Sequence, residues 1–249
     1  MELIHLFVIF LVSVISGSIG TLVGGGSLIT IPTLIHLGLP VHTAIGTDKL
    51  GNLGIASAGW YQFHKKRMID YSIGFAVGIP MMLGAGLGSN IVLAINESML
   101  KTIITIVTIF VLVFIVFFDP KIGIQKSKGV LGRYDYVAGI VVSFLIGIYA
   151  GIYGGGAGTF LSYTLILVFR QTFLECAATV KIAGVLYMTM SASIFAFNEA
   201  IHYPMALAMF FGTFSGSYVG AHYSDKIGNI WIKRLFLAVV LLMVIKLLV

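Results

Sequence analysis

Apolar runs of about 20 residues recur along almost the whole chain, and they restrict its fold more than any other feature. A helix of that length spans the roughly 30 Å hydrocarbon core of a bilayer. Of the 249 residues, 59% are hydrophobic and only 10% are charged, whereas soluble domains carry about 25% charged residues. The sequence therefore predicts an all-α, polytopic transmembrane protein and excludes a soluble catalytic domain.

The apolar runs fall into two halves around one polar stretch. We predict a single transmembrane domain over residues 1–249, made of a first half at 3–118, a cytoplasmic linker at 119–133 and a second half at 135–249. The apolar segments of the two halves are 3–22, 27–38, 43–63, 71–94 and 98–118, and then 135–153, 157–169, 173–197, 203–222 and 230–249.

The two halves also match each other in sequence at a shift of about 130 residues. Gly24-Gly25-Gly26 corresponds to Gly154-Gly155-Gly156, and Thr47-Asp48-Lys49 corresponds to Thr179-Val180-Lys181. Further matches, in the same order, pair Gly84, Gly88 and Lys101 with Gly216, Gly220 and Lys233. Matches that keep their order along the chain indicate an internal duplication.

The short second segment of each half decides how the two copies are oriented. If these segments cross the membrane, the copies are inverted; if they are re-entrant, the copies are parallel. The basic stretches that share the cytoplasmic side in the inverted arrangement are 65–67, the linker, Arg170 and 226–234. Because cytoplasmic loops are enriched in Lys and Arg, the inverted arrangement is favoured, with both termini outside.

A glycine triplet precedes the short segment in each half. Glycine adopts backbone conformations that other residues resist, so Gly24-Gly25-Gly26 and Gly154-Gly155-Gly156 are predicted to break the helix. We expect Ser27 to cap the helix that follows the first break. The free N–H groups and the positive end of that helix would attract an anion. Close helix packing through small residues is the alternative explanation of both triplets.

Three charged residues, Asp48, Lys49 and Lys181, are predicted to lie inside the spans. Placing each charge inside the membrane costs at least about 2.5–3.5 kcal/mol of free energy. We expect Lys49 and Lys181 to approach each other across a pseudo-two-fold axis and to bind one anion between them. The alternatives are that each lysine extends to an interface or pairs with a carboxylate such as Asp48. Asn52, one turn from Asp48, either shares the site or links two helices. The predicted substrate-binding residues are therefore Lys49, Lys181, Thr47, Thr179, Asp48, Asn52, Gly24, Gly25, Gly26, Ser27, Gly154, Gly155 and Gly156.

Signatures of other functions are missing from the sequence. The histidines show no metal-ligand spacing, and the single cysteine, Cys176, has no partner for a zinc site or an internal disulfide. Hydrolase, metalloprotease and nucleotide-loop motifs are absent. The basic residues stand in short clusters between apolar runs and form no nucleic-acid-binding patch. We therefore expect no enzymatic activity, no metal or other cofactor, and no nucleic-acid partner.

These motifs resemble the TauE/SafE sulfite-exporter family of bacterial and archaeal membrane proteins, over essentially the whole chain. In the first half the resemblance rests on Gly17 through Gly26, Ile31-Pro32-Thr33-Leu34, Gly38-Leu39-Pro40 and residues 44–50. It is weaker in the second half, at Gly147, Gly151, 154–158 and Thr179-Val180-Lys181. The second half departs from the pattern because Ser162 stands where a proline is expected, and no proline follows Arg170. The resemblance implies a permease of a prokaryotic plasma membrane that exports sulfite, organosulfonates or related sulfur oxyanions.

The residues and the resemblance agree on an anion, because helix N-termini and buried lysines both favour negative charge. The predicted function is transport of a small sulfur oxyanion by alternating access at a midplane site between the copies. The alternatives are a carrier of a cationic or zwitterionic solute centred on Asp48, and a non-transporting assembly or sensor component. The predicted partners are the anion and the lipid bilayer; a coupling ion (proton or sodium), the direction of transport and the oligomeric state stay open.

Overall fold

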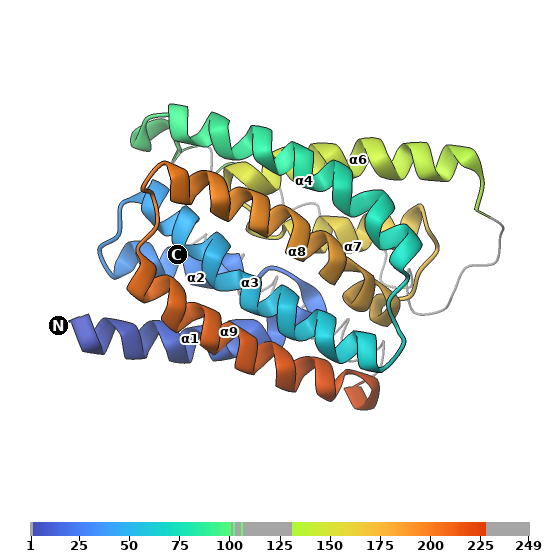
Figure 1. Ribbon diagram of the computed structural model, residues 1–249, viewed down its shortest axis with the longest axis horizontal. Helices are drawn as coiled ribbons and strands as arrows, with labels where there is room; N and C mark the ends of the chain where they lie inside the picture. Colours follow the sequence, from blue (N-terminus) through green and yellow to red (C-terminus); the bar gives the residue numbers. More distant parts are fainter. Residues whose placement is uncertain (1, 101, 103–105, 107–130, 228–249) are drawn as a thin grey trace.

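The described part of the chain is a bundle of helices (Figure 1). A computed structural model describes residues 2–100, 102, 106 and 131–227. The helices are α1 (Glu2–Val23), α2 (Ser27–His36), α3 (Val41–Lys65), α4 (Tyr71–Ala94), α6 (Arg133–Ile152), α7 (Ala157–Leu167), α8 (Phe173–Phe197) and α9 (Tyr203–His222). Most of the segment expected at 98–118, nearly all of the linker 119–133 and all of the segment at 230–249 lie outside the described residues.

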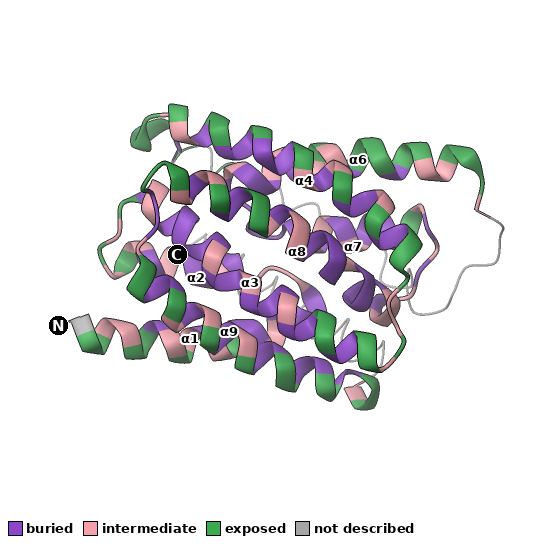
Figure 2. Ribbon diagram, viewed as in Figure 1, coloured by how far each residue is buried: buried purple, intermediate pink, exposed green. Residues whose placement is uncertain are grey.

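The bundle has the composition of a membrane protein. By length and apolar character α1, α4, α6 and α8 are each able to cross a bilayer, and α2 and α7 are shorter apolar helices. Exposed positions follow the outward sides of the helices (Figure 2). Many of them carry large apolar side chains, where a soluble protein carries charge; examples are Phe7, Leu83, Val141 and Phe211. The predicted all-α, multi-pass membrane fold is confirmed.

Short polar motifs in the sequence fix where several helices begin. Asp70 precedes α4 and accepts a hydrogen bond from the Ile73 N–H at 3.0 Å. Thr172 and Glu175 form a reciprocal capping box at the start of α8. The His202 Nδ1 accepts from the Met205 N–H at 3.3 Å at the start of α9. These side chains satisfy N–H groups that have no acceptor inside their own helix.

The helices form two groups that each mix the halves of the sequence. In one group α1 and α3 pack against α9; in the other α6 and α8 pack against α4 (Figure 1). The fourth helix of each half is thus exchanged. α4, from the first half, packs with α6 and α8, and α9, from the second half, packs with α1 and α3. The two groups meet where α3 contacts α8.

Glycines set the close approach of helices within each group. A Cβ on Gly88 of α4 would overlap the Ile148 carbonyl of α6, and a Cβ on Gly216 of α9 would overlap the Val14 carbonyl of α1. Both α4–α6 and α1–α9 run parallel, whereas α3 and α8 run in opposite directions (Figure 1). Accordingly, Gly46 near the start of α3 contacts the end of α8 at Phe195. These directions agree with inverted copies.

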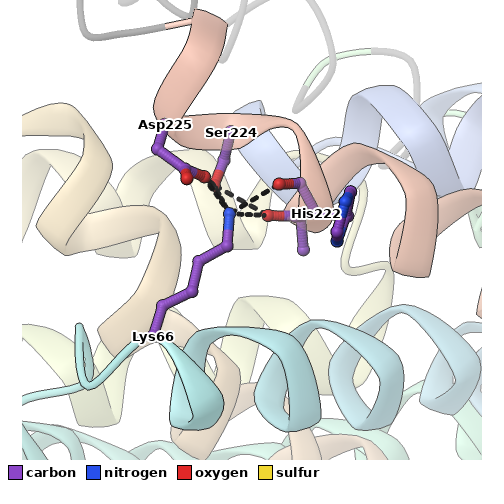
Figure 3. Close-up of polar contacts among 5 residues, drawn as sticks. Lys66, His222, Ser224 and Asp225 are labelled. Carbon is purple, nitrogen blue, oxygen red and sulfur yellow. Dashed lines mark hydrogen bonds and ion pairs between the residues drawn. The ribbon is translucent and has the colours of Figure 1, made fainter.

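Basic residues gather at one end of the bundle. The Lys66 ammonium, after α3, donates to the Ala221 carbonyl at 2.9 Å and the His222 carbonyl at 2.6 Å at the end of α9, and it pairs with Asp225 (Figure 3). The loop after α3 and the turn after α9 therefore share one end, as inverted copies require and parallel copies do not. Among the described residues, the Lys and Arg residues at this end are Lys65, Lys66, Arg67, Arg133, Arg170 and Lys226.

The orientation in the membrane is a testable prediction of this charge distribution. With Cys176 replaced by Ala, a cysteine at Lys65 is expected to react with an impermeant maleimide only after cells are permeabilised. A cysteine at Asn198, which is exposed at the opposite end, is expected to react in intact cells. Labelling of both positions from the same side would contradict the arrangement.

Candidate functional site

Both glycine triplets lie in breaks between helices. α1 ends at Val23 and α2 begins at Ser27; α6 ends at Ile152 and α7 begins at Ala157. In the first break Gly24 and Gly25 have φ values of +80° and +78°, and in the second Gly154 and Gly156 have values of +88° and +83°. Side chains on L-residues resist this left-handed region, so the glycines allow the chain to turn between the two helices.

The expected capping role of Ser27 is wrong. The N-cap of α2 is Gly26, whose carbonyl accepts from the N–H groups of Ile29 at 3.0 Å and Thr30 at 3.2 Å. Ser27 already belongs to the first turn of the helix, whereas a capping side chain comes from the residue before it. The Ser27 hydroxyl instead accepts a hydrogen bond from Asn52 Nδ2 at 3.1 Å.

A cavity of about 50 Å³ lies between the two breaks. Since one buried water needs about 10–15 Å³, the cavity has room for a few waters or one small solute. Its polar lining consists of Thr21, Ser27, Asn52, Lys181 and Tyr187, together with Gly24, Gly25, Gly26, Gly154, Gly158 and Ser162. The rest of the lining is mostly apolar, including Leu22, Ile55, Met81, Leu161 and Met188.

Lys181 of α8 supplies the positive charge of this cavity. It is 5% exposed, and its side chain lies against α3, where a Cβ on Gly59 would be 2.8 Å from Lys181 Cε. The same Cβ would be 2.9 Å from Thr21 Oγ1, so the threonine hydroxyl lies close to the lysine side chain. Within the described part of the chain, no hydrogen bond or ion pair reaches the Lys181 ammonium, and no other charged side chain lines the cavity.

The start of α2 also faces the cavity, through Gly26 and Ser27. The Leu28 and Ile29 N–H groups already donate to the carbonyls of Gly25 and Gly26. The Gly26 and Ser27 N–H groups, for which the described residues provide no acceptor, therefore form the free positive end of this helix. An anion in the cavity would therefore meet a positive helix end on one side and the Lys181 side chain on another.

Lys49 of α3 occupies a different environment. Its ammonium donates to the Tyr153 carbonyl at 2.7 Å, next to Gly154. Tyr153 is the C-cap of α6, and carbonyls at a helix end are the ones that side-chain donors such as this lysine reach. The matched positions predict that Lys49 and Lys181 share one site. The structure does not bring them together: Lys181 lines the cavity, and Lys49 does not.

The two matched threonines connect helices and lie away from the cavity lining. Thr47 Oγ1 accepts from the backbone N–H of His202 at 2.9 Å, and Thr179 Oγ1 accepts from the backbone N–H of Asp70 at 3.4 Å. His202 and Asp70 are the residues that cap the exchanged helices α9 and α4. Each threonine therefore holds the start of an exchanged helix in its group.

Asp48 is buried beside the cavity and bonded to α2. Its Oδ1 accepts hydrogen bonds from the Thr30 hydroxyl and from Asn52 Nδ2, the latter at 2.8 Å. Asn52 and Ser27 line the cavity, but Asp48 does not. Four residues thus form one hydrogen-bonded cluster, Asp48, Asn52, Thr30 and Ser27. Only the Asn52 amide and the Ser27 hydroxyl of this cluster line the cavity.

Three side chains of the polar lining, Thr21, Ser162 and Tyr187, are not among the predicted site residues. Thr21 is in the last turn of α1, and Ser217 Oγ donates to its hydroxyl at 2.9 Å. Its counterpart in the second half is Gly151, so the repeat gave no indication of it. Its position three residues before the first break was the available clue. Tyr187 lies among apolar residues of α8, and nothing in its local sequence indicates a site.

Comparison with known proteins agrees with the fold and its membrane character. The family model described as "Sulfite exporter TauE/SafE" matches residues 9–247. A probable membrane transporter protein of Haemophilus influenzae is 28% identical over 217 residues, covering 87% of this chain and 84% of that protein. The probable membrane transporter protein YdhB of Bacillus subtilis is 25% identical, covering 92% of this chain and 92% of that protein. The probable membrane transporter protein YfcA of Escherichia coli K12 is 23% identical, covering 97% of this chain and 88% of that protein. No solved structure matches significantly. The chain belongs to the TauE/SafE sulfite exporter family of membrane transporters.

Proposed function

We propose that this transporter carries a small sulfur oxyanion, such as sulfite or an organosulfonate, and binds it in the cavity between the glycine breaks. The observation that carries the proposal is the buried Lys181 ammonium, for which the described residues provide no partner. A buried cation is costly in the membrane interior, and an oxyanion offsets that cost by accepting charge-assisted hydrogen bonds.

The other polar groups of the cavity suit the same ligand. The Thr21 and Ser27 hydroxyls and the backbone N–H groups of Gly26 and Ser27 are hydrogen-bond donors for the remaining oxygens of the anion. The described lining holds no carboxylate, because Asp48 lies behind Asn52 and Ser27. This argues against a cationic substrate centred on Asp48. The family name supports sulfite within the class of small oxyanions.

The proposed mechanism is alternating access. The cavity lies between the two halves at their breaks, which is where transporters with inverted repeats bind substrate. In the proposed cycle the substrate stays at the breaks while the two helix groups change their relative angle, opening the cavity first to one side of the membrane and then to the other. The prokaryotic plasma membrane is the proposed location.

Loss of the Lys181 charge tests this assignment. Lys181→Met keeps a similar apolar volume but removes a charged hydrogen bond worth about 1.5–3 kcal/mol, so affinity for sulfite and methanesulfonate is expected to fall by about 10- to 150-fold. The measurement is calorimetric binding to purified protein, with anion flux in proteoliposomes as a second readout. Lys65→Met, the same change at an exposed helix end, is the matched control and is expected to bind as the wild type does.

Two results would contradict the proposal. One is a wild-type protein that binds neither anion. The other is a correctly folded Lys181→Met variant whose affinity equals that of the Lys65→Met control.

A further inference from the structure

Two buried oxygen atoms beside the cavity have no hydrogen-bond partner among the described residues: Oδ2 of Asp48 and Oδ1 of Asn52. They belong to neighbouring groups, since the Asn52 amide already donates to Asp48 Oδ1 at 2.8 Å. Both residues are almost completely buried, at 0% and 1% exposure. An acceptor without a donor is unfavourable in such surroundings, so the pair needs a hydrogen.

The adjacent cation does not provide it. The Lys49 ammonium donates to the Tyr153 carbonyl, and no ion pair with Asp48 is formed within the described residues. The charged and titratable groups that face Asp48 are Lys49 on its own helix and Tyr187 on α8, while α2 contributes the hydroxyls of Ser27 and Thr30. Of these, the Thr30 hydroxyl is already bonded to the other carboxylate oxygen, Oδ1, and the Ser27 hydroxyl, although it lies beside the carboxylate, makes no hydrogen bond to Oδ2.

One proton would satisfy both oxygens. A carboxylic acid and a primary amide pair through two hydrogen bonds, and the amide-to-carboxyl bond of that pair is present here. Adding a proton to Asp48 Oδ2 converts it from an acceptor to a donor, and the free oxygen of the same amide is its natural acceptor. The carboxylate then becomes a neutral acid, which suits a site inside the membrane.

We propose that Asp48 is the proton-binding site of this transporter, that Asn52 Oδ1 accepts the hydrogen bond of the protonated acid, and that the proton and the anion bind together. The coupling follows from position and rests on the proposed anion site. Asn52 and Ser27 line the cavity and are bonded to each other at 3.1 Å, so an anion there lies next to the Asp48 pair. A nearby negative charge favours the protonated acid, and by reciprocity the neutral acid favours the anion.

The first test counts protons on anion binding. Methanesulfonate is the probe, because it takes up no proton itself near neutral pH. At a pH at which Asp48 is ionised in the anion-free protein, calorimetric titration of the full-length protein in buffers of different ionisation enthalpy is expected to show uptake of about one proton per anion. Asp48→Asn is expected to reduce this to about zero, whereas the exposed Glu97→Gln is expected to keep about one. In proteoliposomes, accumulation driven by a pH gradient is expected to fall at least about tenfold in Asp48→Asn, with anion exchange retained.

The second test needs no anion. An infrared titration of the wild-type protein is expected to show a protonated carboxyl band as the pH is lowered, and Asp48→Asn is expected to lack it. If neither methanesulfonate nor sulfite binds the wild type, the proposed function fails, while this band still decides on the proton site. Anion binding without proton uptake in the wild type would overturn the coupling, even if Asp48→Asn did not fold. A band unchanged in Asp48→Asn would overturn the site itself.

Discussion

Gly154→Ala is expected to destabilise the protein strongly, by about 2–5 kcal/mol. Gly154 has a φ of +88°, and an L-residue in that region costs about 1–2 kcal/mol. The added methyl would also overlap the Lys49 ammonium and lie 3.0 Å from the Ala150 carbonyl oxygen. Moving the ammonium away from the Tyr153 carbonyl leaves a buried charged donor unsatisfied, at a further cost of about 1–3 kcal/mol.

Gly38→Ala is the matched control for this substitution. Gly38 has a similar φ of +97°, but nothing lies within 4 Å of the position of its Cβ, so about 1–2 kcal/mol is expected from the backbone alone. The measurement is reversible unfolding in detergent. In a Lys49→Met background the cost of Gly154→Ala is expected to approach that of Gly38→Ala, because the displaced ammonium is gone. Equal costs for Gly154→Ala and Gly38→Ala in the wild-type background would contradict the role of Lys49 described here.

A second large effect is expected at the contact between α4 and α6. Gly88→Ala adds a methyl that would overlap the Ile148 carbonyl, and a main-chain atom is able to move only if the two helices separate. Overpacking of this kind costs about 1–3 kcal/mol. Gly86→Ala, on the same helix, is the control, because its methyl would meet the flexible end of Met190 at 3.0 Å. The midpoint temperature of thermal unfolding in detergent is expected to be much lower for Gly88→Ala than for Gly86→Ala. Equal midpoints would show that α4 and α6 do not pack closely through Gly88.

The sequence allowed the helices, both breaks and the buried charges to be predicted, because each depends on local properties. Apolar length identifies a span, and a glycine triplet permits positive φ wherever it stands. The partner of Lys49 was not predictable in this way, because it is a main-chain carbonyl 104 residues away. Every residue has such a carbonyl, so no side-chain pattern distinguishes the one that Lys49 reaches.

The roles of the matched threonines were misjudged for a related reason. Their positions beside the lysines suggested hydroxyl donors in a binding site. In the structure each hydroxyl accepts from a backbone N–H at the start of a helix of the other half. Thr47 and His202 are related to Thr179 and Asp70 by the same shift. The repeat therefore contained this symmetric pair of bonds, but only the exchange of the fourth helices makes it recognisable.

That exchange also fixes where the chain passes between the two helix groups. Since α4 and α9 belong to the helix group of the other half, the chain crosses between the groups after α3 and again after α8. Each crossing contains a non-glycine residue with positive φ, Arg67 at 53° and Glu199 at 55°, and these two positions correspond in the repeat. The crossings lie at opposite ends of the bundle (Figure 1). In the proposed alternating-access cycle, a rotation of one group against the other would be absorbed by both connections, and we expect them to act as a pair of hinges at opposite ends of the bundle.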